Sequence, residues 1–214
     1  MVAAVSERLP IAVLVSGEGT NLQALLDTVH GREAEVVAVA SSVPGVAALE
    51  RAASSGVPAQ VFARDEYPGR AARDDALADW LAGRGARLVV LAGYMELLGE
   101  PFLARFPGAV INVHPSLLPA FPGLAAIEQA LAYGVKVSGC TVHFADNQYD
   151  HGPIILQRTV EVRDDDTPES LGARVHEQEN EAFPEAIRLF TEGRLKLEGR
   201  RVRIRGDGDR PPSS

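Results

Sequence analysis

Two polar side chains at the end of an apolar segment, Asn112 and His114, are the first residues in the sequence with the chemistry of a catalytic pair. They lie in AVINVHPSLLPAFPG, residues 109–123, where 109–113 predicts a short buried strand and the prolines at 115, 119 and 122 stop it. Residues two apart on a strand project from the same face, so both side chains can reach one small group. The amide can donate a neutral hydrogen bond, and the imidazole can carry a proton near neutral pH. A polar strand end with a structural histidine is the competing interpretation.

Length and composition set the class of protein. The 214 residues, 46% of them hydrophobic, are enough for one good core, so we expect a single α/β domain over residues 1–204 and a disordered tail over 205–214. The one cysteine, Cys140, cannot form an internal disulfide, and a reducing compartment is expected. The N-terminus does not read as a secretory leader and no apolar run approaches a membrane span, so we expect a cytoplasmic protein without a membrane partner.

The formal net charge of −8 argues against a nucleic-acid partner, because phosphate contacts need clustered lysine and arginine. Anionic ligands must instead be held by local donors. The segment 11–15 predicts a buried parallel strand, Ser16–Thr20 a glycine turn, and the leucines that follow a helix. Free N–H groups and the helix dipole at such a junction favour an anion, and a phosphate is the natural occupant. The turn requires glycine even without a ligand, and it matches neither the full dinucleotide fingerprint nor the P-loop.

The next elements repeat the alternation of strand and helix. We expect strands at 35–40, 59–62 and 88–92 and helices at 45–55 and 70–81. This βαβ succession predicts a parallel sheet with right-handed crossovers. Tyr94, Met95, Leu97 and Leu98 follow a strand end and can line an apolar ligand pocket, with core packing as the alternative for each.

The second half of the chain predicts a helix ending at Gly134, a strand over 137–145, a polar turn that carries Asp150, and another strand. A long helix capped by Thr167 should be interrupted or bent near Pro184. Glu179 lies on the more polar face of that helix and would ordinarily be solvated. Residues 195–204 predict a terminal hairpin with a solvated edge.

Five stretches, in order along the chain, carry a resemblance: VLVSGEGTNLQALL, VVLAGYM, INVHPSLLPAFPG, GCTVHF and DHGPIILQ. From about Ile11 to Ile204 the chain resembles the folate-dependent formyltransferases, most closely those that act on glycinamide ribonucleotide in purine synthesis. The resemblance implies a Rossmann-like formyltransferase fold of the α/β class, with a mostly parallel central sheet and helices on both faces. It also implies two small-molecule substrates, glycinamide ribonucleotide and 10-formyltetrahydrofolate, the latter as co-substrate. A homodimer is left open.

The resemblance assigns roles to particular residues. Asn112, His114 and Asp150 form the catalytic trio. The substrate phosphate and ribose are bound by Gly17, Gly19, Thr20, Asn21 and Glu179. The folate is bound by Arg70, Met95, Glu96, Leu97, Leu98, Ala145, Asp146 and Tyr149, with Arg70 a candidate for the folate glutamate carboxylate.

The residue types of the trio suit direct transfer of a formyl group. The substrate amine attacks the formyl carbon, and Asn112 and a protonated His114 stabilise the negative charge that grows on the formyl oxygen. Asp150 keeps His114 charged and relays protons from the attacking ammonium to the leaving N10. No protein nucleophile is needed, so Ser116 and Cys140 are interpreted as structural. No metal is expected, because the histidines and Asp150 lack a compact ligand spacing.

Three positions depart from the pattern of these formyltransferases. Glu18 lies in the glycine turn, where an uncharged residue is usual. Glu96 follows Met95, where an arginine is common, which removes one contact to the folate tail. Residues 124–128, LAAIE, lack the polar residues often found there. None of these departures removes the trio.

Other functions compete with this interpretation. A formyltetrahydrofolate deformylase shares the trio but resembles a longer chain with an added N-terminal domain, whereas the first strand here begins by residue 11. Formyltransferases acting on other amines have a different first loop. A nicotinamide oxidoreductase would need a third glycine and an acidic residue after the second strand, where Ser41 and Ser42 stand. A noncatalytic folate or nucleotide binder would have no use for the whole trio.

Overall fold

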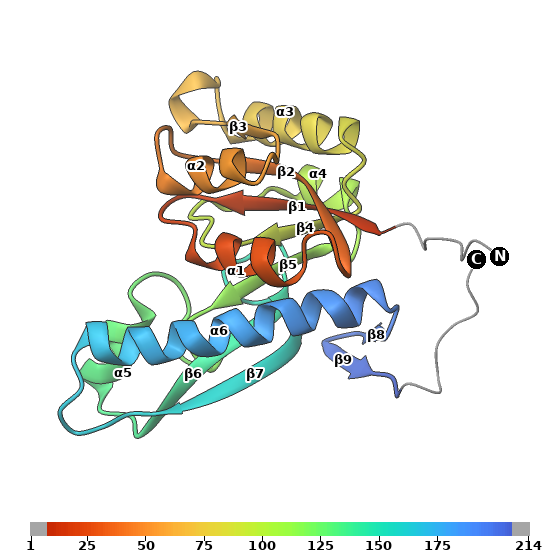
Figure 1. Cartoon of the computed structure of the whole chain (residues 1–214). Coiled ribbons are helices and arrows are strands. Elements are labelled where there is room, and N and C mark those ends of the chain that lie inside the picture. The colour runs from red at the N-terminus through yellow and green to blue at the C-terminus, as the bar shows by residue number, and fades with distance from the viewer. Residues whose placement is uncertain (1–7, 207–214) are drawn as a thin grey trace.

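The computed structural model of the chain describes residues 8–206, and most of the tail expected at 205–214 lies outside this range. A seven-stranded sheet runs in the order β3-β2-β1-β4-β5-β6-β7 (Figure 1). Its strands are β1 (Leu9–Val15), β2 (Ala34–Ser41), β3 (Ala59–Val61), β4 (Leu88–Leu91), β5 (Val110–His114), β6 (Val137–Phe144) and β7 (Ile154–Glu161). The first five strands are parallel, and β6 and β7 pair antiparallel to their neighbours. The predicted mostly parallel sheet is confirmed.

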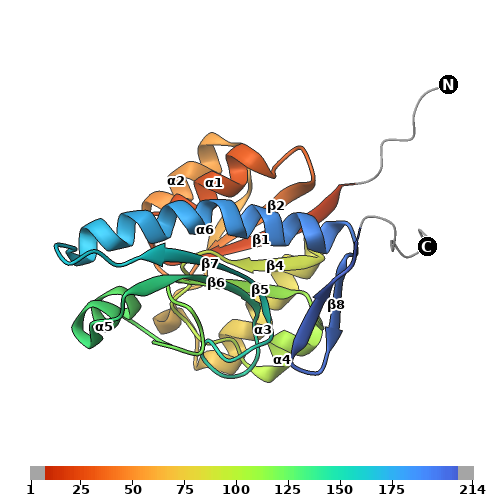
Figure 2. The same cartoon turned by 90° about the horizontal axis from the view of Figure 1, so that it is seen from below.

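Helices cover both faces of this sheet, as predicted. They are α1 (Thr20–Thr28), α2 (Ala47–Ser54), α3 (Arg70–Gly83), α4 (Glu100–Arg105), α5 (Ala126–Tyr133) and α6 (Pro168–Thr191). In Figure 2, α1, α2 and α6 lie on one face, and α3 and α4 lie on the other. Neither α4 nor the 3₁₀ turn Arg64–Glu66 was expected from the sequence. Both are too short to show a helical repeat of apolar residues.

The long helix α6 corrects one expectation. Thr167 caps it, and Ser170 returns the hydrogen bond to complete a capping box. Of the two outcomes expected near Pro184, an interruption or a bend, the interruption is wrong, because the helix continues through the proline to Thr191. Proline removes one backbone hydrogen bond from a helix. Phe183 and Ile187 lie on either side of it in the core, and the burial of such side chains contributes roughly 1.5–3 kcal/mol each. Packing therefore keeps the helix intact.

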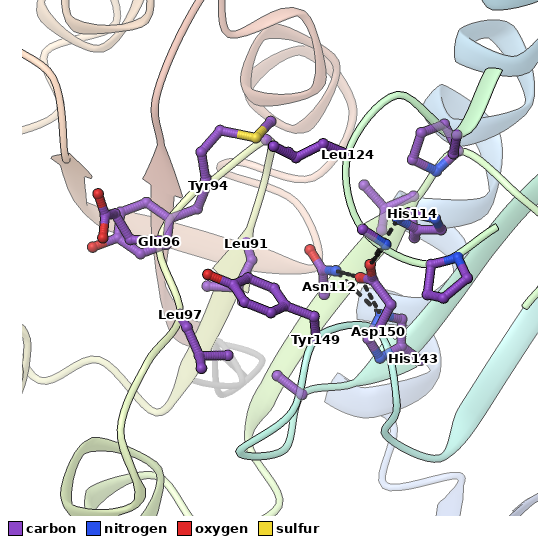
Figure 3. Close-up of a pocket in the computed structure, with 18 of the residues that line it drawn as sticks. Leu91, Tyr94, Glu96, Leu97, Asn112, His114, Leu124, His143, Tyr149 and Asp150 are labelled. Atoms are coloured by element: carbon purple, nitrogen blue, oxygen red, sulfur yellow. Dashed lines mark hydrogen bonds and ion pairs between the residues drawn. The ribbon is translucent and has the colours of Figure 1, made fainter. Parts of the chain in front are cut away.

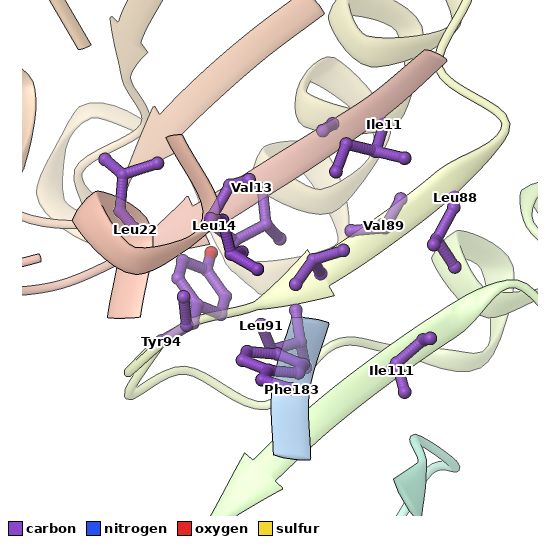
Figure 4. Packing of buried hydrophobic residues seen from close by; sticks show 14 of the residues in the cluster. Ile11, Val13, Leu14, Leu22, Leu88, Val89, Leu91, Tyr94, Ile111 and Phe183 are labelled. Atoms are coloured by element: carbon purple, nitrogen blue, oxygen red, sulfur yellow. The ribbon is translucent and has the colours of Figure 1, made fainter. Parts of the chain in front are cut away.

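Fully buried apolar residues gather where β1 and β4 lie side by side. Ile11, Val13 and Leu14 of β1 and Val89 of β4 are fully buried, with helices on both sides (Figure 4). Strands covered on both faces need apolar residues at every position, which explains the unbroken runs in the sequence. No helix among residues 8–206 is long and apolar enough to cross a membrane.

The order of the strands fixes where a ligand can bind. From β1 the chain moves outward through β2 to β3, then crosses back to β4 and continues in the other direction. The crevice at such a reversal, beyond the carboxyl ends of the strands, is the usual ligand site in open α/β sheets. Here the loops after β1 and β4 meet there, since Ser16 Oγ accepts a hydrogen bond of 2.9 Å from the Met95 backbone N–H.

The loop after β5 is held in shape by side chains from the antiparallel strands. Thr141 Oγ1 donates to the Ser116 carbonyl at 2.7 Å and accepts from the Leu118 N–H at 3.0 Å. Gln157 Nε2 donates to Thr141 Oγ1 and to the Leu118 carbonyl, each at 3.0 Å.

The predicted hairpin at the end of the chain is confirmed as β8 (Leu195–Glu198) and β9 (Arg201–Ile204). Arg200, which lies in the turn between these two strands, donates a hydrogen bond of 2.7 Å to the His151 carbonyl.

We expect Thr141→Val to lower the free energy of unfolding by about 1–3 kcal/mol, because it leaves buried backbone groups without partners. Urea unfolding followed by circular dichroism measures the change. Thr159→Val, at an exposed position of β7, is the matched control and should stay within about 0.5 kcal/mol of the parent protein. Equal stability of the two variants would contradict this role for Thr141.

Candidate active site

The carboxylate of Asp150 is the centre of a polar cluster at the carboxyl end of β5 (Figure 3). Asp150 Oδ2 lies 3.2 Å from His114 Nδ1 and accepts a 2.7 Å hydrogen bond from the Gly123 N–H. Asp150 Oδ1 accepts from Asn112 Nδ2 at 3.3 Å and lies 3.7 Å from His143 Nε2. The three residues predicted to act together are therefore in contact, although they come from distant parts of the sequence.

The backbone around Asp150 is shaped to deliver this carboxylate. Asp150 has a φ of 51°, in the left-handed region that residues with side chains rarely occupy. A Cβ at Gly152 would lie 1.7 Å from the Phe144 carbonyl oxygen, so only glycine lets the loop close against the end of β6. Phe121 and Ala125, in the facing loop, also have positive φ values. Backbone strain of this kind is concentrated at functional sites.

Both ring nitrogens of His114 face oxygen atoms. Nδ1 faces the Asp150 carboxylate, and Nε2 lies 2.8 Å from the Phe121 carbonyl oxygen. A carbonyl and a carboxylate can only accept, so both contacts are hydrogen bonds only when both nitrogens carry protons. The ring is 4% exposed, which keeps water away from these contacts. This arrangement suits a positively charged imidazole.

The environment keeps Asp150 ionised. Burial by itself raises the pKa of this carboxyl group, since its side chain is only 9% exposed. The interaction with His143, the hydrogen bond from Gly123 and the charge of His114 outweigh burial, and the pKa lies below its ordinary value. Asp150 is therefore a carboxylate at neutral pH.

His143 was missed as a site residue in the sequence. It lies directly opposite Asn112 in the antiparallel pair of β5 and β6, and its Nε2 is 3.1 Å from Asn112 Nδ2. Its Nδ1 lies 2.9 Å from the Phe144 carbonyl oxygen. With Asn112 Nδ2 turned to His143 and Asp150, the amide oxygen points away from the cluster (Figure 3). The sequence predicts a strand over 137–145 that includes His143, but only the strand register brings this residue to Asp150.

One cavity of about 630 Å³ joins this cluster to most of the predicted ligand positions. The predicted residues that line it are Asn21, Met95, Glu96, Leu97, Leu98, Asn112, His114, Ala145, Asp146, Tyr149, Asp150 and Glu179. Leu124 and Ala125 line it as well, so the unusual segment 124–128 adds apolar surface. Gly17, Gly19 and Thr20 do not line the cavity. Arg70 lies instead in a neighbouring groove, which shares Leu97 and Leu98 with it.

The glycine turn after β1 is packed tightly against α2. Gly19 has a φ of 73°, and a Cβ there would lie 2.7 Å from Ala48 Cβ, so this position needs glycine for structural reasons. Arg51 of α2 donates from Nε to the Glu18 carbonyl at 2.8 Å. The Glu18 side chain is exposed, and α1 begins directly after the turn without a side-chain cap. The first N–H groups of an α-helix have no partner within the helix and favour an anion.

Glu179 is buried, at 2% exposure, so the expectation of a solvated side chain is wrong. Its Oε2 accepts from Asn21 Nδ2 at 3.1 Å and lies 2.8 Å from His176 Nδ1. The hydrogen bond to Glu179 raises the pKa of His176, although burial opposes the shift. The packing of α1 against α6 thus places a carboxylate between the glycine turn and Asp150. Helical periodicity could not reveal this contact, because it depends on two helices far apart in sequence.

The two residues interpreted as structural behave accordingly. Ser116 Oγ donates to the Ala120 carbonyl at 2.6 Å within the proline loop. Cys140 is fully buried in β6, and burial raises the pKa of its thiol to about 12. Within the described residues, no three histidine, cysteine or acidic side chains are grouped as they would be around a metal ion.

Comparisons with known proteins extend this description. The Formyl transferase family model matches residues 9–187. The chain is 41% identical over 189 residues to a phosphoribosylglycinamide formyltransferase of Haemophilus influenzae, which covers 87% of this chain and 89% of that protein. Glycinamide ribonucleotide transformylase 1 of Symbiobacterium toebii superposes with a TM-score of 0.91 at 52% identity, covering 93% of this chain and 95% of that one.

Some relatives are much longer. The chain is 44% identical over 193 residues to the trifunctional purine biosynthetic protein adenosine-3 of Drosophila pseudoobscura, which is 88% of this chain but 14% of that protein. The chain thus spans about a seventh of that relative's length. The family match nevertheless covers all the strands of the central sheet and the residues around Asp150. The chain belongs to the formyl transferase family.

Proposed function

We propose that the chain transfers the formyl group of 10-formyltetrahydrofolate to the amine of glycinamide ribonucleotide, in purine synthesis in the cytoplasm. The observation that carries this proposal is a single cavity, which is lined by the polar residues Glu179 and Asn21, by the Asp150 cluster and by an apolar wall. A polar nucleotide and an apolar pterin can therefore meet at Asp150. The names of the bacterial relatives support a formyl transfer with the ribonucleotide as acceptor.

The ribonucleotide binds along the polar side of this cavity. Its phosphate lies at the glycine turn, where the first N–H groups of α1 and the helix dipole favour an anion. The buried carboxylate of Glu179 accepts hydrogen bonds from the ribose hydroxyls, as carboxylates do. The amine then points along the cavity toward Asp150, which lines the same space.

The folate binds on the apolar side. Met95, Leu97 and Leu98 come from the loop after β4, and Ala145 and Tyr149 come from the loop after β6. Residues of both loops line the same cavity as Asn112, so a flat ring between them brings its formyl group to Asn112. Arg70, in the neighbouring groove that shares Leu97 and Leu98 with the cavity, binds the anionic tail of the folate.

The transfer needs no covalent intermediate on the protein. The amine nitrogen forms a bond to the formyl carbon, the bond from that carbon to N10 breaks, and a proton passes from the new ammonium to N10. Asp150 takes the proton from the ammonium and returns it to N10, directly or through one water, which is general acid–base catalysis. Two substrates held in this orientation also gain from proximity.

The negative charge on the formyl oxygen is stabilised by the cluster around Asp150. A doubly protonated His114 supplies a fixed positive charge within a few ångströms, where little water screens it. The Asn112 Nδ2 carries two protons, and it donates one of them to Asp150 Oδ1. The other, directed to His143 Nε2, can be donated to the formyl oxygen instead. His143 and Asp150 thus position this amide for the reaction.

We expect His114→Ala and Asp150→Asn each to lower kcat by at least about 100-fold, because each removes a charge from the transition state. The assay follows formyl transfer from 10-formyltetrahydrofolate with and without glycinamide ribonucleotide. His30→Gln, outside the cavity, is the control and should keep its activity, and circular dichroism verifies the fold of each variant.

Near-normal turnover in either site variant would contradict the proposed roles. Loss of the formyl group without the ribonucleotide would identify a deformylase instead. Binding of both ligands without any reaction would identify a noncatalytic binder.

The charge of Glu18 should weaken phosphate binding, because it lies in the turn that holds the phosphate. We expect Glu18→Asn to lower the KM for the ribonucleotide by about 2- to 5-fold, the size typical of an exposed charge pair. Steady-state kinetics at low ionic strength, where screening is weakest, measure the effect. Glu66→Gln removes the same charge from the 3₁₀ turn and is the control. An unchanged KM in Glu18→Asn would mean that this carboxylate points to solvent.

The lowered pKa of Asp150 predicts how stability depends on pH. The folded protein holds the carboxylate ionised to lower pH than the unfolded chain does, where the pKa is 3.8. The stability that it contributes is therefore complete above this value and is lost as the pH falls through the folded-state pKa. We expect the difference in unfolding free energy between the parent and Asp150→Asn to be largest near neutral pH and to shrink below about pH 4. Urea titrations at several pH values test this, and a difference that grows in acid would refute it.

A further inference from the structure

The loop that follows β4, residues 93–99, is attached to α3 by two buried charged side chains. Arg73 is completely buried and its neighbour Asp74 is 2% exposed. Arg73 Nε and Nη2 lie 3.2 Å and 2.9 Å from Asp74 Oδ1. Taking two such charges out of water is costly unless further hydrogen bonds satisfy them. The additional partners of this pair therefore determine which part of the chain it stabilises.

Those additional partners lie on the loop. Asp74 Oδ2 accepts a 2.8 Å hydrogen bond from the Gly99 N–H. Arg73 Nη1 lies 2.8 Å from Glu96 Oε2, and Arg73 Nη2 reaches the Leu97 carbonyl at 3.5 Å. Three residues of this short loop thus contact two adjacent side chains of α3. We call Arg73, Asp74 and Glu96 the charge clamp.

Glu96 is needed to balance the charge of Arg73. Asp74 shares its carboxylate between Arg73 and the Gly99 N–H. The other acidic group nearby is the phenol of Tyr94, but burial raises its pKa to about 12, although Arg73 opposes the shift, so it stays neutral. Glu96 is therefore the second anion that faces the buried guanidinium. Burial lowers the pKa of Arg73, but the interactions with Glu96 and Asp74 outweigh burial and raise it.

The clamped loop is the same one that forms the apolar wall of the cavity. Met95, Leu97 and Leu98 line the cavity, and Glu96 lies among them (Figure 3). At the other end of the loop, Ser16 Oγ holds the Met95 N–H. The loop is thus fixed from β1 at residue 95 and from α3 at residues 96–99. The position of the wall follows from these two attachments.

We infer that Glu96 is a positioning residue for the folate, which acts through Arg73 and does not contact the folate itself. Its carboxylate holds the loop in the shape that lets Met95, Leu97 and Leu98 contact a flat ring. This inference rests on the proposed function, because it assigns the wall to the folate. It also gives a role to the acidic residue that stands where other formyltransferases often have an arginine.

A different role for Glu96 would predict the opposite change in the KM for the folate when Glu96 is removed. If its carboxylate faced the ligand, it would repel the anionic tail of the folate, and its removal would tighten folate binding. If it belongs to the charge clamp, its removal frees the loop and weakens folate binding. The direction of the change in KM therefore separates the two roles.

The test uses Glu96→Ala and Glu96→Gln in the full chain. We expect Glu96→Ala to raise the KM for 10-formyltetrahydrofolate about 10-fold, with kcat and the KM for the ribonucleotide changed less than about 3-fold. The KM of Glu96→Gln for 10-formyltetrahydrofolate should lie between those of Glu96→Ala and the parent, because the amide oxygen can still face Arg73 but carries no charge. Asp79→Asn is the matched control. Asp79 lies on α3, as Arg73 and Asp74 do, and the substitution breaks its exposed ion pair with Arg105 of α4. It should leave all three constants unchanged.

Amide hydrogen exchange in the ligand-free protein provides a second readout that does not depend on the reaction. Amides 94–99 should exchange faster in Glu96→Ala than in the parent or in Asp79→Asn. A lower KM for the folate in both Glu96 variants, or unchanged exchange in Glu96→Ala, would overturn the inference. If the parent protein transfers no formyl group, the proposed function fails, while faster exchange in Glu96→Ala would still support the clamp and unchanged exchange would still overturn it.

Discussion

A carboxylate held inside the protein is the feature on which the site depends. Asp150 is buried, and an isolated ionised carboxylate is costly to bury. The imidazole of His114 and the backbone N–H of Gly123 make it stable there, together with the amide of Asn112. Each of these groups must be in place at the same time, because leaving a buried charge without partners costs more than forming the pair contributes. The loops after β5 and β6 are therefore fixed relative to each other.

This requirement explains the unusual backbone of both loops. Phe121 takes up a positive φ and presents its carbonyl to His114, while Asp150 takes up a positive φ and presents its carboxylate. Conformations of this kind cost of order 1–3 kcal/mol each and persist only where the surroundings impose them. Here the hydrogen bonds to Thr141 and the close approach permitted by Gly152 impose them. The antiparallel strands β6 and β7 thus support the shape of the site, whereas the parallel strands provide the edge on which it is built.

Much of this could be predicted from the sequence, because it depends on local patterns. The apolar runs of β1 and β4 predicted buried parallel strands, and the spacing of Asn112 and His114 placed both on one strand face. His143, the Phe121 carbonyl and the buried state of Glu179 could not be predicted in this way. Each depends on a contact between segments far apart in the sequence, set by strand register or by the packing of α1 on α6. The continuity of α6 through Pro184 has the same origin, since tertiary packing outweighs the local preference against proline.

The same distinction applies to the two acidic residues that depart from the pattern of formyltransferases. Glu18 and Glu96 look alike in the sequence, since each adds a negative charge beside an anionic ligand. In the structure Glu18 is exposed on the glycine turn, whereas Glu96 faces a fully buried guanidinium. A charge exposed to water is screened, but a charge paired with a buried arginine is part of the framework. The effect of an acidic residue near a binding site therefore depends on the group that its carboxylate faces, and only the fold determines that group.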